Sequence, residues 1–64
     1  DDPHVREIAV FAVTKYNVQE NKDLELSQVL AGQQQVVSGM NYNLTLQVKD
    51  GLSTAKYVAV VYES

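Results

Sequence analysis

The chain has 64 residues, of which 45% are hydrophobic and 20% charged, and this composition predicts one small folded domain spanning residues 1–64. Because there is no cysteine, disulfides, thiolate metal sites and a catalytic thiol are excluded, and a domain this short buries only about 60% of its unfolded surface. The net charge of −3 is scattered and no apolar run reaches the ~18 residues of a membrane span, so neither nucleic acid nor a membrane is an expected partner.

The first predicted element is a helix near the N-terminus. Asp2 can accept hydrogen bonds from the free N–H groups of a first helical turn, and Pro3 suits the first helical position. At 100° per residue the following segment has one apolar face, which predicts a helix that ends near Asn17 and packs on a sheet. The polar run over residues 19–23 then indicates a loop. The predicted apolar face consists of Val5, Ile8, Ala9, Ala12, Val13 and Tyr16.

Two later segments have the side-chain period of a β-strand. Residues 24–32 begin with alternating apolar residues and continue as an apolar track to Gly32, which predicts a strand with a bulge near that glycine. Residues 40–49 alternate most regularly and predict a second strand. The inward-facing set of the second strand is predicted to be Met40, Tyr42, Leu44, Leu46 and Val48.

A hairpin turn and a third strand follow. Asp50-Gly51 is typical of a tight turn between strands, because glycine adopts positive φ at little cost. Residues 54–62 are rich in valine and tyrosine, which are common in strands. The predicted fold class is therefore α+β, with one N-terminal helix packed across an antiparallel sheet.

Few residues of this chain could carry chemistry. Catalysis needs a nucleophile beside a base, or an acid and a base with separated pKa values, and the chain offers one histidine and no clustered carboxylates. His4 is interpreted as an exposed polar residue, since no metal-ligating partner lies within a turn or two of it. The four tyrosines are interpreted as core and rim residues. Neither an enzyme nor a site for a cofactor or metal is predicted.

One segment needs more than a structural explanation: Gln35, Val36, Val37, Ser38 and Gly39, between the first two predicted strands. A simple turn is polar and rich in glycine, whereas Val36-Val37 places two stiff apolar side chains at a hairpin tip. Two exposed valines gain nothing unless a partner covers them. Gly39 permits a tight reversal and lets another surface approach closely. This segment is the predicted binding site.

Two motifs of the chain resemble those of the cystatins, and in particular of their plant branch. Residues 35–39 are similar to the family's Q-x-V-x-G motif, and residues 8–17 are similar to the L-A-R-F-A-V-like helix signature that ends in an aromatic residue or histidine followed by asparagine. The chain departs from that signature at Val10 and Lys15. Both positions lie off the predicted apolar face, so the fold is not expected to change.

The resemblance implies a competitive inhibitor of papain-like cysteine proteases, whose tip at residues 35–39 enters the active-site cleft. It also implies two further inhibitory elements, an N-terminal arm with a glycine and a second hairpin tip with a Pro-Trp pair. Neither is found in these 64 residues, and the family's last strand is missing as well. The chain is therefore expected to be a partial domain, truncated at both ends, that inhibits more weakly than a complete member of the family.

Other functions stay open at this point. If the tip opened into a continuous strand, two chains could exchange helix-plus-strand units and form a domain-swapped homodimer with little inhibition. The open edge of the sheet could instead bind an extended peptide by strand addition. Both a cytoplasmic and a secreted location are compatible with the chain, whose N-terminus lacks the pattern of a signal peptide.

Overall fold

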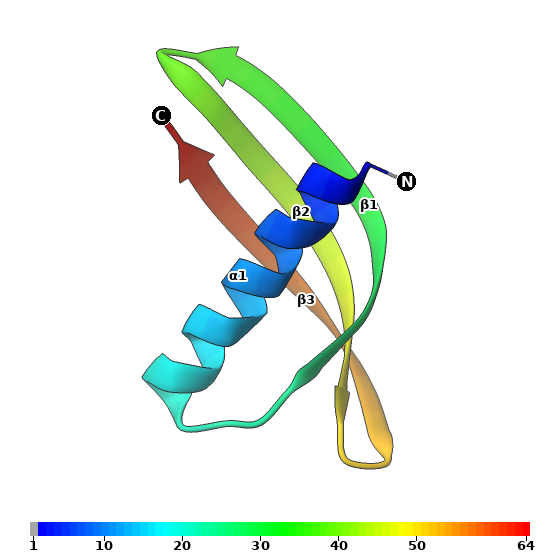
Figure 1. The fold of residues 1–64 in the computed structure, drawn as a ribbon. Helices are drawn as coiled ribbons and strands as arrows, with labels where there is room; N and C mark the ends of the chain where they lie inside the picture. The colour runs from blue at the N-terminus through cyan, green and yellow to red at the C-terminus, as the bar shows by residue number, and fades with distance from the viewer. Residues whose placement is uncertain (1) are drawn as a thin grey trace.

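A computed structural model describes residues 2–64 and shows one helix followed by three strands (Figure 1). The elements are α1 (Pro3–Glu20), β1 (Glu25–Val37), β2 (Gly39–Asp50) and β3 (Ser53–Glu63). The strands form one antiparallel sheet in the order β1-β2-β3, so β2 lies in the centre. The predicted α+β arrangement, an N-terminal helix with an antiparallel sheet, is confirmed.

The start of α1 follows the prediction. Asp2 Oδ1 accepts a hydrogen bond from the backbone N–H of His4 at 3.0 Å. Pro3 occupies the first helical position, where a backbone N–H would have no helical partner. The predicted apolar face packs on the sheet and stabilises the helix by burial. On this face Ile8, Ala9 and Val13 are buried, and Val5, Ala12 and Tyr16 are half-buried.

The end of α1 differs from the prediction, because the helix continues past Asn17 to Glu20. Asn21 then caps it in the left-handed conformation, with φ of 54°, which asparagine tolerates better than most residues. The Asn17 side chain instead bonds the backbone of Leu24 twice: its Nδ2 donates to the carbonyl at 2.9 Å, and its Oδ1 accepts from the N–H at 3.0 Å. These two bonds hold the loop that leads into β1.

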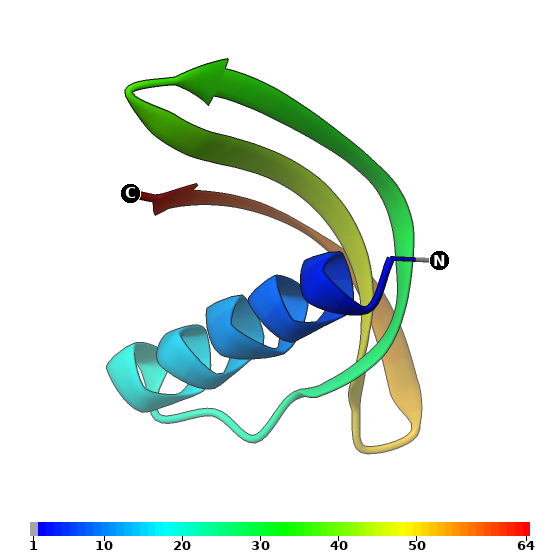
Figure 2. The same ribbon diagram turned by 45° about the horizontal axis from the view of Figure 1, so that its top comes forward.

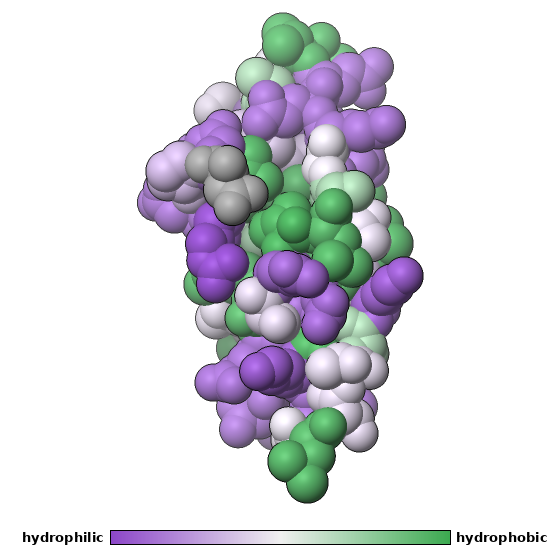
Figure 3. Space-filling view, turned by 90° about the vertical axis from the view of Figure 1, so that its right-hand side faces the viewer, coloured by the Kyte–Doolittle hydropathy of each residue, from purple (hydrophilic) through white to green (hydrophobic). Residues whose placement is uncertain are grey.

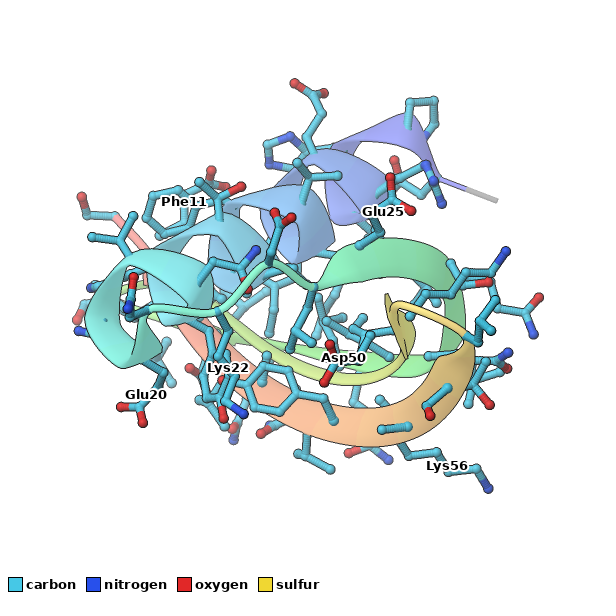
Figure 4. The ribbon with its side chains drawn as sticks, turned by 90° about the horizontal axis from the view of Figure 1, so that it is seen from below. Phe11, Glu20, Lys22, Glu25, Asp50 and Lys56 are labelled. Carbon is cyan, nitrogen blue, oxygen red and sulfur yellow. The ribbon has the colours of Figure 1, made fainter. Side chains whose placement is uncertain are left out.

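The core lies between α1 and the concave face of the sheet, which curves around the helix (Figure 2). The central strand contributes most of it, since Leu44, Leu46 and Val48 are each at most 1% exposed. Tyr42 is also buried, so the alternation predicted for this strand is confirmed. Seen from below, Lys56 points away from the helix on the outer side of β3, as alternation requires (Figure 4).

β1 is longer than predicted, since it continues beyond Gly32 to Val37. The additional residues are exposed, and they pair with the first part of β2. Backbone hydrogen bonding to β2, rather than burial, therefore makes this segment a strand. The pairing shifts register between Leu26 and Gln28 and between Val29 and Ala31. The second irregularity lies just before Gly32, near the predicted bulge, and the first was not predicted.

The second hairpin follows the prediction closely. Asp50 pairs with Ser53, which leaves Gly51 and Leu52 as a two-residue loop. Gly51 has φ of 64°, the positive angle for which glycine is favoured in such turns. β3 includes the whole of the predicted third strand. The two hairpins lie at opposite ends of the sheet (Figure 1).

Candidate functional site

The predicted binding segment, residues 35–39, forms the tip of the β1–β2 hairpin. Val37 pairs with Gly39, so the chain reverses direction at Ser38. Gly39 has φ of 142°, an angle that favours glycine. The structure thus brings all five predicted residues together at one end of the molecule, in a bent rather than a continuous strand (Figure 1).

The two valines of the tip are exposed on opposite faces of the hairpin. Val36 is 76% exposed and Val37 is 54% exposed. Because successive side chains of a strand alternate, Val36 shares the face of its partner Met40, which is the core face, and Val37 points to the outer face. The space-filling view shows hydrophobic surface at this end of the molecule (Figure 3). The tip is therefore a two-sided apolar wedge.

Tyr62, which lies outside the predicted segment, also contacts the tip. Its hydroxyl donates a hydrogen bond to the backbone carbonyl of Ser38, 24 residues away in the chain. Its ring lies so close to Gly39 that a Cβ added there would be 2.8 Å from Cζ. The general interpretation of the tyrosines as core and rim residues missed this role. Alternation along β3 could have placed Tyr62 on the outer face, but no local pattern marks the contact.

His4 lies beside the end of β3 and pairs with Glu63. Its Nε2 is 2.9 Å from Glu63 Oε1, to which the Tyr42 hydroxyl also donates at 3.5 Å. The rings of His4 and Tyr42 meet edge to face, with centroids 6.1 Å apart. The predicted exposure of His4 is confirmed, whereas its partner, 59 residues away, could not be predicted from neighbouring residues.

These contacts change the acid–base properties of two groups. The hydrogen bond that His4 donates to Glu63, and then the negative charge of Glu63, raise the pKa of His4 above the usual value. Glu7 and Asp2 add smaller electrostatic effects in the same direction. Burial, and then the charge of Glu63, raise the pKa of Tyr42. His4 is therefore protonated more readily in the folded chain than in the unfolded one.

The His4–Glu63 pair predicts a dependence of stability on pH. A raised folded pKa means that the pair stabilises the fold fully below the unfolded pKa of about 6.5, and that this contribution is lost as pH rises through the folded pKa. In urea denaturation we expect the free energy of unfolding to decrease slightly as pH rises from below about 6.5 through the raised pKa of His4, and the decrease is small because the pair is exposed. His4→Gln should remove this decrease. Equal pH slopes for the two proteins would contradict the assignment.

Metal sites, membrane-spanning helices and unpaired buried polar atoms would each bear on function. Within residues 2–64, no group of three or more His, Cys, Asp or Glu side chains is placed to hold a metal ion. In the same part of the chain, no helix is both long enough and apolar enough to cross a membrane. Every buried side-chain nitrogen or oxygen described there has a hydrogen-bond partner.

Comparison with known proteins finds inhibitors of proteinases. The chain is 46% identical over 63 residues to cysteine proteinase inhibitor 8 of Oryza sativa subsp. japonica. This alignment covers 97% of the chain and 51% of the relative. It is 44% identical over 66 aligned positions to cysteine proteinase inhibitor 6 of the same plant. This alignment covers 98% of the chain and 58% of the relative. Cystatin-1 of Zea mays is 38% identical over 63 residues, and this alignment covers 98% of the chain and 47% of the relative. The chain thus spans about half the length of the curated relatives it matches.

The family relationship follows from these matches. The two relatives from Oryza sativa subsp. japonica are named as cysteine proteinase inhibitors, in agreement with the prediction that the chain is not an enzyme. The relatives also confirm the similarity to plant cystatins that was predicted from the helix motif and the tip motif. A family model described as Aspartic acid proteinase inhibitor matches residues 1–64. Because this match includes every residue of the sequence, the chain belongs to the aspartic acid proteinase inhibitor family.

Proposed function

We propose that this chain is a competitive inhibitor of papain-like cysteine proteases, and that the tip at residues 35–39 enters the active-site cleft. The observation that carries the proposal is the exposure of Val36 and Val37 on opposite faces of a tight reversal. The names of the cysteine proteinase inhibitors to which the chain is similar support this class of target. Inhibition would act by excluding substrate, so the tip needs no reactive group.

The tip suits an apolar cleft for two physical reasons. Full burial of a valine side chain contributes about 1.5–3 kcal/mol, and both tip valines retain most or half of their surface for a partner. The stretch Gln33–Gly39 also carries no charged side chain, so docking removes no charge of the tip from water. Both effects favour insertion between apolar walls.

The order of the free tip also favours binding. β1 remains paired with β2 as far as Val37, next to the reversal at Ser38. A segment that is ordered before it binds loses little conformational entropy in the complex. The wedge is therefore expected to keep its shape when it enters the cleft, and more of the free energy of valine burial remains as affinity.

A titration of papain tests the proposal. Val37→Asp replaces a valine that would be buried by a charged side chain, and it is expected to weaken inhibition at least about 10- to 100-fold. Leu52→Asp is the matched control, since Leu52 is fully exposed in the β2–β3 turn at the other end of the molecule (Figure 1). This control should inhibit like the unmodified chain. Equal inhibition constants for Val37→Asp and the unmodified chain would remove the tip from the mechanism.

The description of the family supplies a second class of target, the aspartic proteinases. A steric wedge carries no group that reacts specifically with a thiol, so its shape and polarity do not depend on the nucleophile of the enzyme. Pepsin is the probe for this class, and its inhibition is measured with the unmodified chain, Val37→Asp and Leu52→Asp. Inhibition of pepsin but not papain, if lost in Val37→Asp, would replace the target class and retain the tip as the binding site.

A second function, assembly, is favoured by the tightness of the reversal. Ser38 alone separates the two strands, whereas hairpin loops commonly contain two residues, and short strained hinges promote exchange of elements between chains. If the tip opened, β1 and β2 would run straight and pair with those of a second chain in a homodimer. Light scattering beside the papain assay separates the two functions. A stable dimer without inhibition supports assembly, and an inhibitory monomer supports the wedge.

A further inference from the structure

The reversal at the tip is supported from the end of β3. Ser38 is exposed, lies between β1 and β2 and has no partner in the strand pairing, so its carbonyl can accept a hydrogen bond from a side chain. The Tyr62 hydroxyl is that donor. Tyr62 pairs with Asn41 near the start of β2, so its side chain extends along the sheet toward the reversal. A contact between the third strand and the tip is thus built into the pairing of the strands.

The ring of Tyr62 and the glycine of the tip fit one another. A Cβ added to Gly39 would lie 2.5 Å from the Tyr62 hydroxyl oxygen and 2.8 Å from Cζ. The most favourable separation of two nonbonded carbon atoms is about 3.5–4.0 Å, so a Cβ at 2.8 Å would overlap the ring. The ring can therefore occupy this position only over a glycine, and the close packing limits the movement of the tip.

The strand end that carries Tyr62 is itself held in place. The next residue, Glu63, accepts hydrogen bonds from Tyr42 on the central strand and pairs with His4 at the start of α1, at 3.5 Å and 2.9 Å. Glu63 also pairs with Met40 in the sheet. Contacts therefore extend from the helix through Glu63 and Tyr62 to the carbonyl of Ser38.

We propose that Tyr62 is a positioning residue of the inhibitor, whose hydroxyl and ring hold the tip in the shape that binds the protease. This inference rests on the proposed function. Without the hydroxyl, the peptide of Ser38 can reorient and the tip samples more conformations, which must be lost again on binding. The loss of one hydrogen bond of this kind weakens inhibition by roughly 3- to 10-fold.

Tyr62→Phe tests the inference because it removes only the hydroxyl and leaves the ring over Gly39. Tyr57→Phe is the matched control, since Tyr57 lies on the same strand but faces the helix, where its ring contacts that of Tyr16 with centroids 4.8 Å apart. We expect Tyr62→Phe to raise the inhibition constant for papain by roughly 3- to 10-fold through faster dissociation. Tyr57→Phe should leave the constant unchanged.

Backbone ¹⁵N relaxation in the free chain gives a readout that a general loss of stability would not move. Order parameters at Ser38 and Gly39 should fall in Tyr62→Phe from about 0.85, the value of rigid backbone, and stay unchanged in Tyr57→Phe. Unchanged order at the tip, or unchanged inhibition despite reduced order, would overturn the inference. If the unmodified chain inhibits no protease, the proposed function fails. The order parameters at Ser38 and Gly39 then decide by themselves whether Tyr62 holds the tip.

Discussion

Leu46→Ala is expected to lower the free energy of unfolding at 25 °C by about 2–5 kcal/mol. Leu46 is fully buried in the central strand, where it lies opposite Val29 and Tyr57 of the neighbouring strands. Truncation of a buried leucine to alanine costs about 2–5 kcal/mol, because transfer free energy is lost and a cavity is left behind. A 64-residue domain has a total stability of roughly 3–10 kcal/mol. One substitution can therefore remove a large part of the total stability.

Urea denaturation followed by far-ultraviolet circular dichroism measures this effect. Leu52→Ala is the control of identical chemistry, since Leu52 is fully exposed and buries nothing that the substitution removes. The control should shift the free energy of unfolding by no more than about 0.5 kcal/mol. Similar midpoints for the two variants would show that the inner face of β2 is not the main source of stability.

The parts of the fold that depend on one segment alone could be predicted from the sequence. The helix cap at Asp2, the apolar face of α1 and the alternation of β2 each follow from side chains that are close in the chain. Gly51 defines the second hairpin in the same way, because its positive φ is a property of the residue itself. The α+β class then follows, since an amphipathic helix and a sheet with one apolar face bury each other.

The errors occurred where contacts between segments outweigh local preference. Asn17 is a plausible helix end, yet its side chain is used by the loop at Leu24, and Asn21 takes the left-handed cap position four residues later. The glutamines before Val36 have no buried face and no alternation of polarity, so only their pairing with β2 makes them a strand. Residue propensities along one segment predict neither the side-chain bonds of Asn17 nor the pairing of the glutamines with β2.

The same distinction between local and long-range contacts applies to the candidate site. The tip could be recognised because two adjacent valines are unusual at a reversal, and because the motif that they form with Gly39 is contiguous in the chain. Its support could not, because Tyr62 and Ser38 are 24 residues apart and His4 and Glu63 are 59 apart. These pairs meet only after the sheet has formed, and each involves common residue types. The position of Glu63 opposite Met40 is what brings Tyr62 to the tip.

Gly39→Ala is expected to affect stability and inhibition together. At φ of 142°, a side chain strains the backbone by about 1–3 kcal/mol. The added Cβ would also lie 2.8 Å from the Glu63 carbonyl oxygen, a backbone atom that cannot turn away, so β3 must shift from the tip. We therefore expect a larger loss in the free energy of unfolding than strain alone produces, with weaker inhibition of papain because the valines no longer hold their positions.

Gly51→Ala is the matched control for this substitution. Gly51 also has positive φ, at 64°, but nothing lies within 4 Å of an added Cβ, so only the backbone strain of about 1–2 kcal/mol is expected and inhibition should be unchanged. Gly39→Ala combined with Tyr62→Ala should recover only part of the stability, because the carbonyl of Glu63 and the positive φ remain. Equal losses for Gly39→Ala and Gly51→Ala would mean that the end of β3 does not press on the tip, and the tip would then owe its shape to the β1–β2 pairing alone.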